Sequence, residues 1–121
     1  MITNFENETE ELTEKELALV PIMVDGFKKI TKDKAWKSDD IIKIVNAKDY
    51  GCQLTQPRLR KLCNYIRVNG MIPLIATSNG YYVSYEKDEI MKQIISLEQR
   101  ARSIQNCADG LRGLLIELDL K

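Results

Sequence analysis

The residues of this chain best suited to binding an anion lie between Gln53 and Gly70, a stretch without aspartate or glutamate. Guanidinium and ammonium groups bind phosphate oxygens, and arginine and asparagine also pair with the edges of bases. We therefore expect side chains of this stretch, together with Asn79 from a later turn, to form a contact surface for double-stranded DNA. The predicted contact residues are Gln56, Arg58, Arg60, Lys61, Asn64, Arg67 and Asn79. The alternative is a solvated helix face without a ligand.

The expected roles of these side chains differ with their chemistry. Asparagine can bond an adenine at two positions and arginine a guanine at two positions, so Asn64 and Arg60 are the predicted base readers. Arg58, Lys61 and Arg67 are predicted to bind phosphate.

The distribution of charge supports this interpretation better than the net charge, which is zero. Residues 1–16 hold six glutamates against Lys15, so the chain begins with an acidic segment. Residues 27–37 hold five lysines against Asp33. These lysines offer a second phosphate-binding strip, although a solvated helix end is the simpler interpretation.

Several classes of protein do not fit the composition. The chain has no histidine, the commonest general base and metal ligand, and its three cysteines show no CxxC spacing. It also lacks the glycine-rich loops that bind nucleotide phosphates. We expect no enzyme, cofactor or metal. Without a membrane-length apolar run or a signal peptide, and with free thiols, we expect a cytoplasmic protein.

A helix must position the basic residues. Thr55 is a predicted N-cap, Pro57 is tolerated in the first turn, and Gly70 ends the helix. Its apolar face is predicted to consist of Leu59, Leu62, Cys63 and Ile66.

A β-hairpin is expected directly after this helix. Asn79-Gly80 is the preferred pair for a two-residue turn, and it sets Ser78 opposite Tyr81. The same register sets Ala76 opposite Val83 and Leu74 opposite Tyr85. The face predicted to point inward then consists of Leu74, Ala76, Tyr81, Val83 and Tyr85. Packing is a more common role for such tyrosines than base stacking. The hairpin has no lysine or arginine, so we expect it to contact phosphates weakly.

Two further helices are predicted upstream. Thr13 and Glu16 have capping-box spacing, so a helix should begin at Glu14 and continue to Ile30, with a kink or break at Pro21. A second helix, capped by Ser38, should fade near Lys48, with a buried stripe formed by Ile41, Ile42, Ile44 and Val45.

A heptad pattern dominates the C-terminal third. Apolar residues recur there at alternating spacings of four and three, as in a coiled coil. The predicted dimerisation residues are Ile90, Ile94, Leu97, Ala101, Ile104, Ala108, Leu111, Leu115 and Leu118. We expect a homodimer through this helix; the alternative is a helix folded back on its own domain.

The order helix, helix, turn, basic helix, hairpin resembles the winged helix superfamily. More narrowly, PRLRKLCNYIRVNGMIPLIATSNGYYV followed by a long charged helix looks like small phage and prophage helix-turn-helix proteins that open with an LTEKELALV-like helix. The likeness spans about residues 12–105 and implies a mainly helical α+β fold. The implied organisation is a flexible acidic N-terminus (1–12), a winged-helix domain (13–85) and a long C-terminal helix (86–121).

The resemblance supplies no reaction and no target, so two functions remain open. The first is a dimeric DNA-binding protein of a phage or mobile element, acting as a transcriptional regulator or replication accessory factor. Its target would be a palindrome with half-sites about one helical turn apart. The second is a winged-helix module that binds another protein and no DNA.

Overall fold

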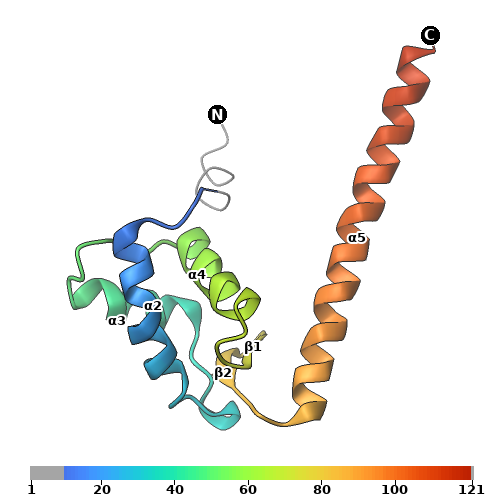
Figure 1. The fold of residues 1–121 in the computed structure, drawn as a ribbon. Helices are drawn as coiled ribbons and strands as arrows, with labels where there is room; N and C mark the ends of the chain where they lie inside the picture. Colours follow the sequence, from blue (N-terminus) through green and yellow to red (C-terminus); the bar gives the residue numbers. More distant parts are fainter. Residues whose placement is uncertain (1–9, 121) are drawn as a thin grey trace. The chain divides into compact units, whose positions relative to one another are not determined.

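The computed structural model describes residues 10–120, in which the fold is α+β and mainly helical (Figure 1). Its contacts divide the chain into two units, which we call the N-terminal unit (up to Tyr85) and the C-terminal unit (from Glu86). The acidic N-terminus was expected to be flexible over residues 1–12, of which 1–9 lie outside the described residues.

Helix α2 spans Glu14–Phe27 and begins with the predicted capping box. The Thr13 backbone N–H donates to Glu16 Oε1 at 3.0 Å, and the Glu16 N–H donates to Thr13 Oγ1 at 3.1 Å. The helix ends three residues earlier than predicted, because the N–H of Ile30 bonds the Phe27 carbonyl in a tighter turn.

The predicted break at Pro21 is wrong, since α2 continues through this residue as one element. Pro21 has no N–H for the carbonyl of Leu17. Both residues lie on the exposed side of the helix, where water can satisfy such a carbonyl.

A short 3₁₀ turn, η1 (Lys32–Lys34), leads to helices α3 (Ser38–Ala47) and α4 (Gln56–Val68). Neither Ser38 nor Thr55 makes the predicted capping hydrogen bond, and Ser38 is already the first helical residue of α3. The turn before α4 is fixed by Asn46, whose amide accepts from the Leu54 N–H at 2.8 Å and donates to its carbonyl at 3.1 Å.

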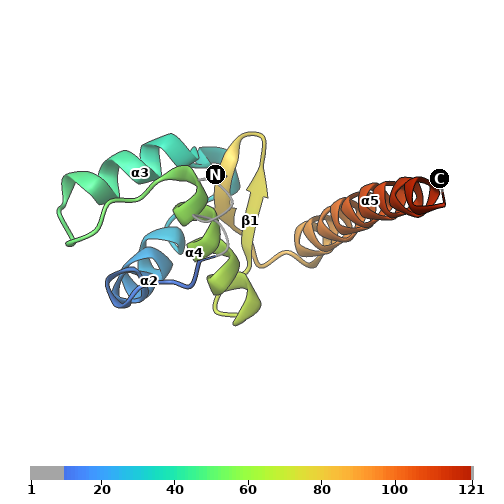
Figure 2. The same cartoon turned by 90° about the horizontal axis from the view of Figure 1, so that it is seen from above.

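Helix α4 is the centre of the N-terminal unit (Figure 2). Leu59, Leu62 and Ile66 are completely buried on its inner face, where it packs against α2, α3 and β1. The helix ends at Asn69, and Gly70 follows with a left-handed φ of 59°, as predicted. The packing fixes which face of α4 remains outside.

The predicted hairpin is present as β1 (Leu74–Thr77) and β2 (Gly80–Val83), but its predicted register is wrong. Ala76 faces Tyr81 and Leu74 faces Val83, so Ser78 and Asn79 occupy the turn. The Thr77 hydroxyl stabilises this turn by accepting from the Asn79 N–H at 3.2 Å.

The shifted register also corrects the predicted inward face. Ile75 and Tyr82 are buried together with Leu74, whereas Tyr85 is 72% exposed. Ala76, Tyr81 and Val83 are half-buried. Both sides of the short hairpin therefore contact other parts of the chain.

The reason for the register lies at Trp36, which forms a β-bridge with Tyr81. The Trp36 N–H donates to the Tyr81 carbonyl at 2.9 Å, and the Tyr81 N–H donates to the Trp36 carbonyl at 2.8 Å. A Cβ on Gly80 would lie 2.4 Å from the Trp36 carbonyl oxygen. Glycine is therefore required at position 80 by this close approach and by its φ of 124°, and not by the central position of a two-residue turn.

Substituting Gly80 with alanine should destabilise the N-terminal unit by about 2 kcal/mol or more, because backbone strain and overlap with Trp36 add. Gly26→Ala is the matched control, since an added Cβ there meets nothing within 4 Å. The control should be neutral or stabilising by up to about 1 kcal/mol. Urea unfolding followed by Trp36 fluorescence measures both. Equal stability of the two variants would contradict the role of Gly80.

The C-terminal unit is one helix, α5, which spans Lys87–Asp119. Its 33 residues correspond to a length of about 50 Å. Within the described chain no residue of α5 is buried. We call the stripe of predicted dimerisation residues on α5 its apolar seam; the large residues of the seam from Ile94 to Leu118 are 36% to 70% exposed.

Candidate nucleic-acid interface

The first predicted contact residue, Arg58, is 8% exposed and belongs to the interior. Its Nε donates to Glu16 Oε2 at 2.8 Å, and its Nη2 forms an ion pair with Glu16 Oε1. Its Nη1 also donates to the Glu10 carbonyl at 2.9 Å, and its Nη2 to the Glu11 carbonyl at 3.1 Å. Arg58 therefore joins α4 to the start of α2, and we remove it from the set of expected phosphate contacts.

The ion pair shifts the titration of both partners. The hydrogen bond from Arg58 lowers the pKa of Glu16 below its ordinary value, although burial acts in the opposite direction. The same bond raises the pKa of Arg58. Both groups therefore carry full charge at neutral pH, and each charge compensates the other away from water.

The outer face of α4 carries most of the remaining predicted residues. Arg60 and Asn64 are exposed, and Lys61 is half-buried. Because Arg60, Asn64 and Arg67 follow one another at spacings of four and three, they form one stripe along the helix. We call this stripe, together with Lys61, the basic face of α4.

Arg67 links the basic face to the hairpin. Its Nε donates to the Leu74 carbonyl at 3.1 Å, and the side chain is half-buried. Burial raises the pKa of the Tyr81 phenol to about 12, against an opposing effect of the positive charges of Arg67 and Arg60. The two arginines therefore lie close enough to the hairpin to act on Tyr81 electrostatically.

Gln56 and Asn79 occupy the two ends of the expected surface. The Gln56 amide donates to Asp39 Oδ1 of α3, so it bridges two helices. Asn79 is exposed in the hairpin turn. The structure thus keeps Asn79 at the surface and uses Gln56 at least partly for packing between helices.

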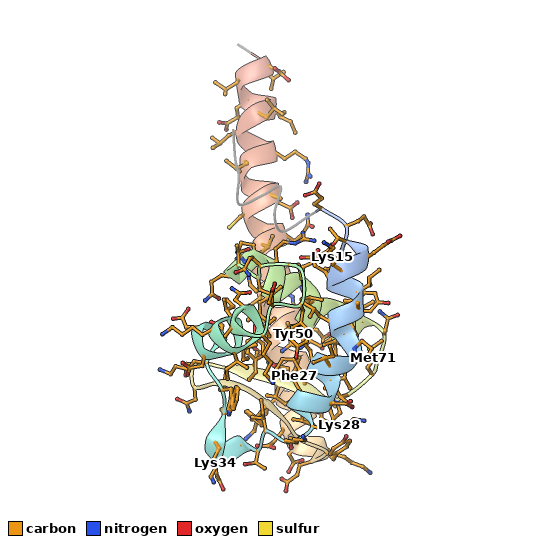
Figure 3. The ribbon with its side chains drawn as sticks, turned by 90° about the vertical axis from the view of Figure 1, so that its left-hand side faces the viewer. Lys15, Phe27, Lys28, Lys34, Tyr50 and Met71 are labelled. Carbon is orange, nitrogen blue, oxygen red and sulfur yellow. The ribbon has the colours of Figure 1, made fainter. Side chains whose placement is uncertain are left out.

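The second basic segment lies on the other side of the hairpin. η1 and α2 contact β2, whereas α4 contacts β1. The Val83 N–H also donates to the Ile30 carbonyl at 3.1 Å, which fixes the lysine-bearing connection against β2. Its lysines, including Lys28 and Lys34 in Figure 3, are all exposed. The hairpin therefore has basic residues on two sides, although it has none itself.

Cys63 contributes packing and not reactivity. It is buried on the inner face of α4, and burial raises the pKa of its thiol to about 11. The thiol is therefore protonated at neutral pH and is a poor nucleophile. Cys107, in contrast, is exposed on α5.

Sequence reasoning missed an apolar groove of about 480 Å³ between α2 and α3. Its lining includes the aromatic residues Phe27, Trp36 and Tyr50 and the charged residues Asp25, Lys29 and Lys48. Figure 3 labels Phe27 and Tyr50. Ile44, predicted to be buried, is 40% exposed and lines this groove. The sequence signal for this groove was the number of isoleucines in α3. A ten-residue helix needs fewer apolar residues than this for a single buried stripe.

Other kinds of site are not observed in the part of the chain that the structure describes. Residues 10–120 hold no group of three His, Cys, Asp or Glu side chains placed to bind a metal ion. None of their helices is long and apolar enough to cross a membrane. Comparison of the chain with family models, curated proteins and solved structures gave no match.

Proposed function

We propose that the N-terminal unit binds double-stranded DNA through the basic face of α4, and that α5 makes the protein a homodimer. The observation that carries this proposal is the stripe of Arg60, Asn64 and Arg67, in which Arg60 and Asn64 are exposed and Arg67 is half-buried, on a helix whose opposite face is buried. A helix held in this way can insert its outer side chains into a major groove as a rigid element.

The surrounding charge also supports the proposal. No acidic residue occurs between Gly51 and Tyr85, so the basic face and the hairpin carry no negative side chain of their own. The lysines between α2 and α3 add positive charge on the far side of β2. A duplex seated on α4 would meet favourable charge on its flanking phosphates too.

The order of the elements agrees with the winged-helix resemblance. Within residues 10–120, helices α2 and α3 precede the basic helix, the hairpin follows it, and Trp36 adds a bridge to β2. On this proposal, α4 reads the major groove. The hairpin turn, formed by Ser78 and Asn79, makes weak contacts to the DNA backbone. A role in a phage or mobile element, as a regulator or accessory factor, is part of the same proposal.

Fluorescence anisotropy of the full chain with random duplex DNA tests the proposal. Arg60, Lys61 and Arg67 offer three phosphate or groove contacts per copy, so log K should fall with log salt at a slope of about −2.7 or steeper. A protein whose binding is absent even at low salt would refute DNA binding. Heparin competition adds nothing to this decision, because heparin binds any basic surface.

The second candidate function is protein binding without DNA, and the groove between α2 and α3 favours it. Its lining is mainly apolar and holds two lysines, Lys29 and Lys48, against one acid, Asp25, which fits an amphipathic helix with acidic flanks. If DNA binding is absent, Ile44→Asp should then abolish the biological activity, while Lys43→Asp, exposed on the same helix, should preserve it.

A further inference from the structure

The apolar seam of α5 holds information about how two copies pair. Six of its large residues, between Ile94 and Leu118, are at least 36% exposed. The seam that needs a partner therefore runs from Ile94 to Leu118. Its centre is near Asn106, less than one turn past Ser103, the middle residue of the helix.

We propose that two copies of α5 pair antiparallel, with the two-fold axis at the level of Asn106. The two copies of Lys87, where each α5 begins, then lie at opposite ends of the helix pair. This inference rests on the homodimer of the proposed function and specifies its geometry.

The two alanines of the seam argue against a parallel pair. Ala101 and Ala108 are seven residues apart, so each would face its own copy across a parallel dimer. Two alanine layers between layers of leucine and isoleucine leave space that the backbones cannot close without separating other layers.

The antiparallel pair removes both gaps by placing each alanine opposite a large side chain. Helices centred at Asn106 put Ala101 opposite Leu111 and Ala108 opposite Ile104 of the other copy. The remaining layers are also formed from residues of the exposed seam, with these partners: Ile94 with Leu118 and Leu97 with Leu115. Each large residue of the exposed seam then has an apolar partner.

Charges beside the seam select this centre. Residues Glu98 and Arg112 flank the seam on the same side, and antiparallel helices bring such positions together. With the axis at Asn106 the two residues are within one turn of the same level, giving two opposite-charge pairs. Arg112 at present bonds Asp109 of its own helix at 2.8 Å on an exposed surface, so exchanging partners costs little.

The nearest alternatives lose these pairs. A shift of the antiparallel register by one heptad puts Leu118 opposite Lys87 and moves Glu98 next to Gln105. A parallel dimer puts Glu98 near Gln93 and Arg112 near Cys107. Neither arrangement forms an opposite-charge pair beside the seam, whereas the proposed one forms two.

The glycines of α5 are compatible with the same arrangement. Gly110 and Gly113 fall on the outer side of the helix, away from the seam, and a Cβ at either would meet nothing within 4 Å. They lower helix propensity without removing a seam contact.

The proposed orientation also fixes how far apart the two helices begin. The two copies of Lys87, where each α5 begins, would be about 57 Å apart at 1.5 Å per residue. Half-sites one helical turn apart are separated by about 34–36 Å. The two points at which the N-terminal units join α5 are therefore farther apart than the half-sites of a compact palindrome.

A distance between spin labels tests the orientation in the full chain. The labelled variant combines Cys52→Ser, Cys107→Ser and Leu120→Cys; Cys63 is buried and protonated, so labelling is confined to position 120. The proposed pair predicts a separation of about 42 Å between the two copies of residue 120. A parallel pair predicts less than about 20 Å, and the shifted register about 52 Å.

The outcomes separate the failure of this inference from the failure of the proposed function. A short distance, or the longer one, overturns the orientation or the centre while the dimer stands. A monomer in sedimentation equilibrium overturns the dimer itself, and neither result bears on DNA binding, which anisotropy measures separately. Ile104→Asp should abolish the 42 Å distance, and Ser103→Asp, on the outer side, should retain it.

Discussion

Replacing Arg58 with methionine is expected to lower the free energy of unfolding of the N-terminal unit by about 3–5 kcal/mol. Methionine retains much of the side-chain volume but leaves the Glu16 carboxylate buried without a positive partner. The carbonyls of Glu10 and Glu11 also lose their donors. Urea unfolding monitored through the single Trp36 measures this unit without a signal from α5.

Two variants isolate the cause of that loss. Arg60→Met, two residues along the same helix and exposed, should change stability by no more than about 0.5 kcal/mol. Glu16→Gln preserves a side chain that can complete the capping box, so Arg58→Met with Glu16→Gln should recover part of the stability that Arg58→Met loses. An Arg58→Met protein as stable as Arg60→Met would show that the ion pair does not stabilise the fold.

The same ion pair predicts how stability depends on pH. Because Arg58 lowers the folded-state pKa of Glu16 below 4.5, the pair contributes fully above that pH. The contribution is lost as pH falls through the lowered pKa, where the carboxylate takes up a proton. The stability difference between the wild type and Arg58→Met should therefore be largest near neutrality and shrink in acid. A difference that is constant from pH 7 to pH 3 would contradict this account.

Features of the fold that depend on neighbouring residues could be predicted from the sequence. Thr13 and Glu16 are three residues apart, and Gly70 directly follows the basic helix, so local geometry was sufficient to place the start of α2 and the end of α4. The outer positions of Arg60 and Asn64 were likewise predictable, because helical periodicity fixes which residues share a face.

Features that depend on distant residues were not predictable in the same way. Arg58 and Glu16 are 42 residues apart, and nothing within α4 indicates that one of its arginines points inward to a carboxylate. The available signal was Glu16 itself, which shares a helical face with Leu19, Val20 and Met23 and would otherwise be a buried, unpaired charge.

The hairpin register failed for a related reason. The preference of Asn-Gly for the turn is a local effect of about the size of one favourable contact, whereas the bridge from Trp36 supplies two backbone hydrogen bonds. A segment far upstream thus determines which residues occupy the turn. The lysines and arginines beside the hairpin also belong to other segments, namely α4 and the connection between α2 and α3. A search of the hairpin sequence alone does not find them.

The second large effect is expected at the basic face of α4. The double variant Arg60→Ala with Lys61→Ala should weaken binding to random duplex DNA by about 10- to 100-fold, because it removes two of the three positive charges of the basic face. The slope of log K against log salt should become shallower by about 1.8 in each bound copy. Anisotropy titrations at several salt concentrations give both quantities from one set of measurements.

The matched control removes the same charges elsewhere. Lys92→Ala with Arg102→Ala also replaces one lysine and one arginine, both exposed on α5 and outside its apolar seam. If only net charge mattered, the two double variants would weaken binding equally. If α4 enters the groove, the control should retain the wild-type salt slope within about 0.5 while the α4 variant loses most of it. A shallower slope in both variants would point to diffuse attraction by the whole chain, and the basic face of α4 would then be no more than one solvated part of a weakly attractive surface.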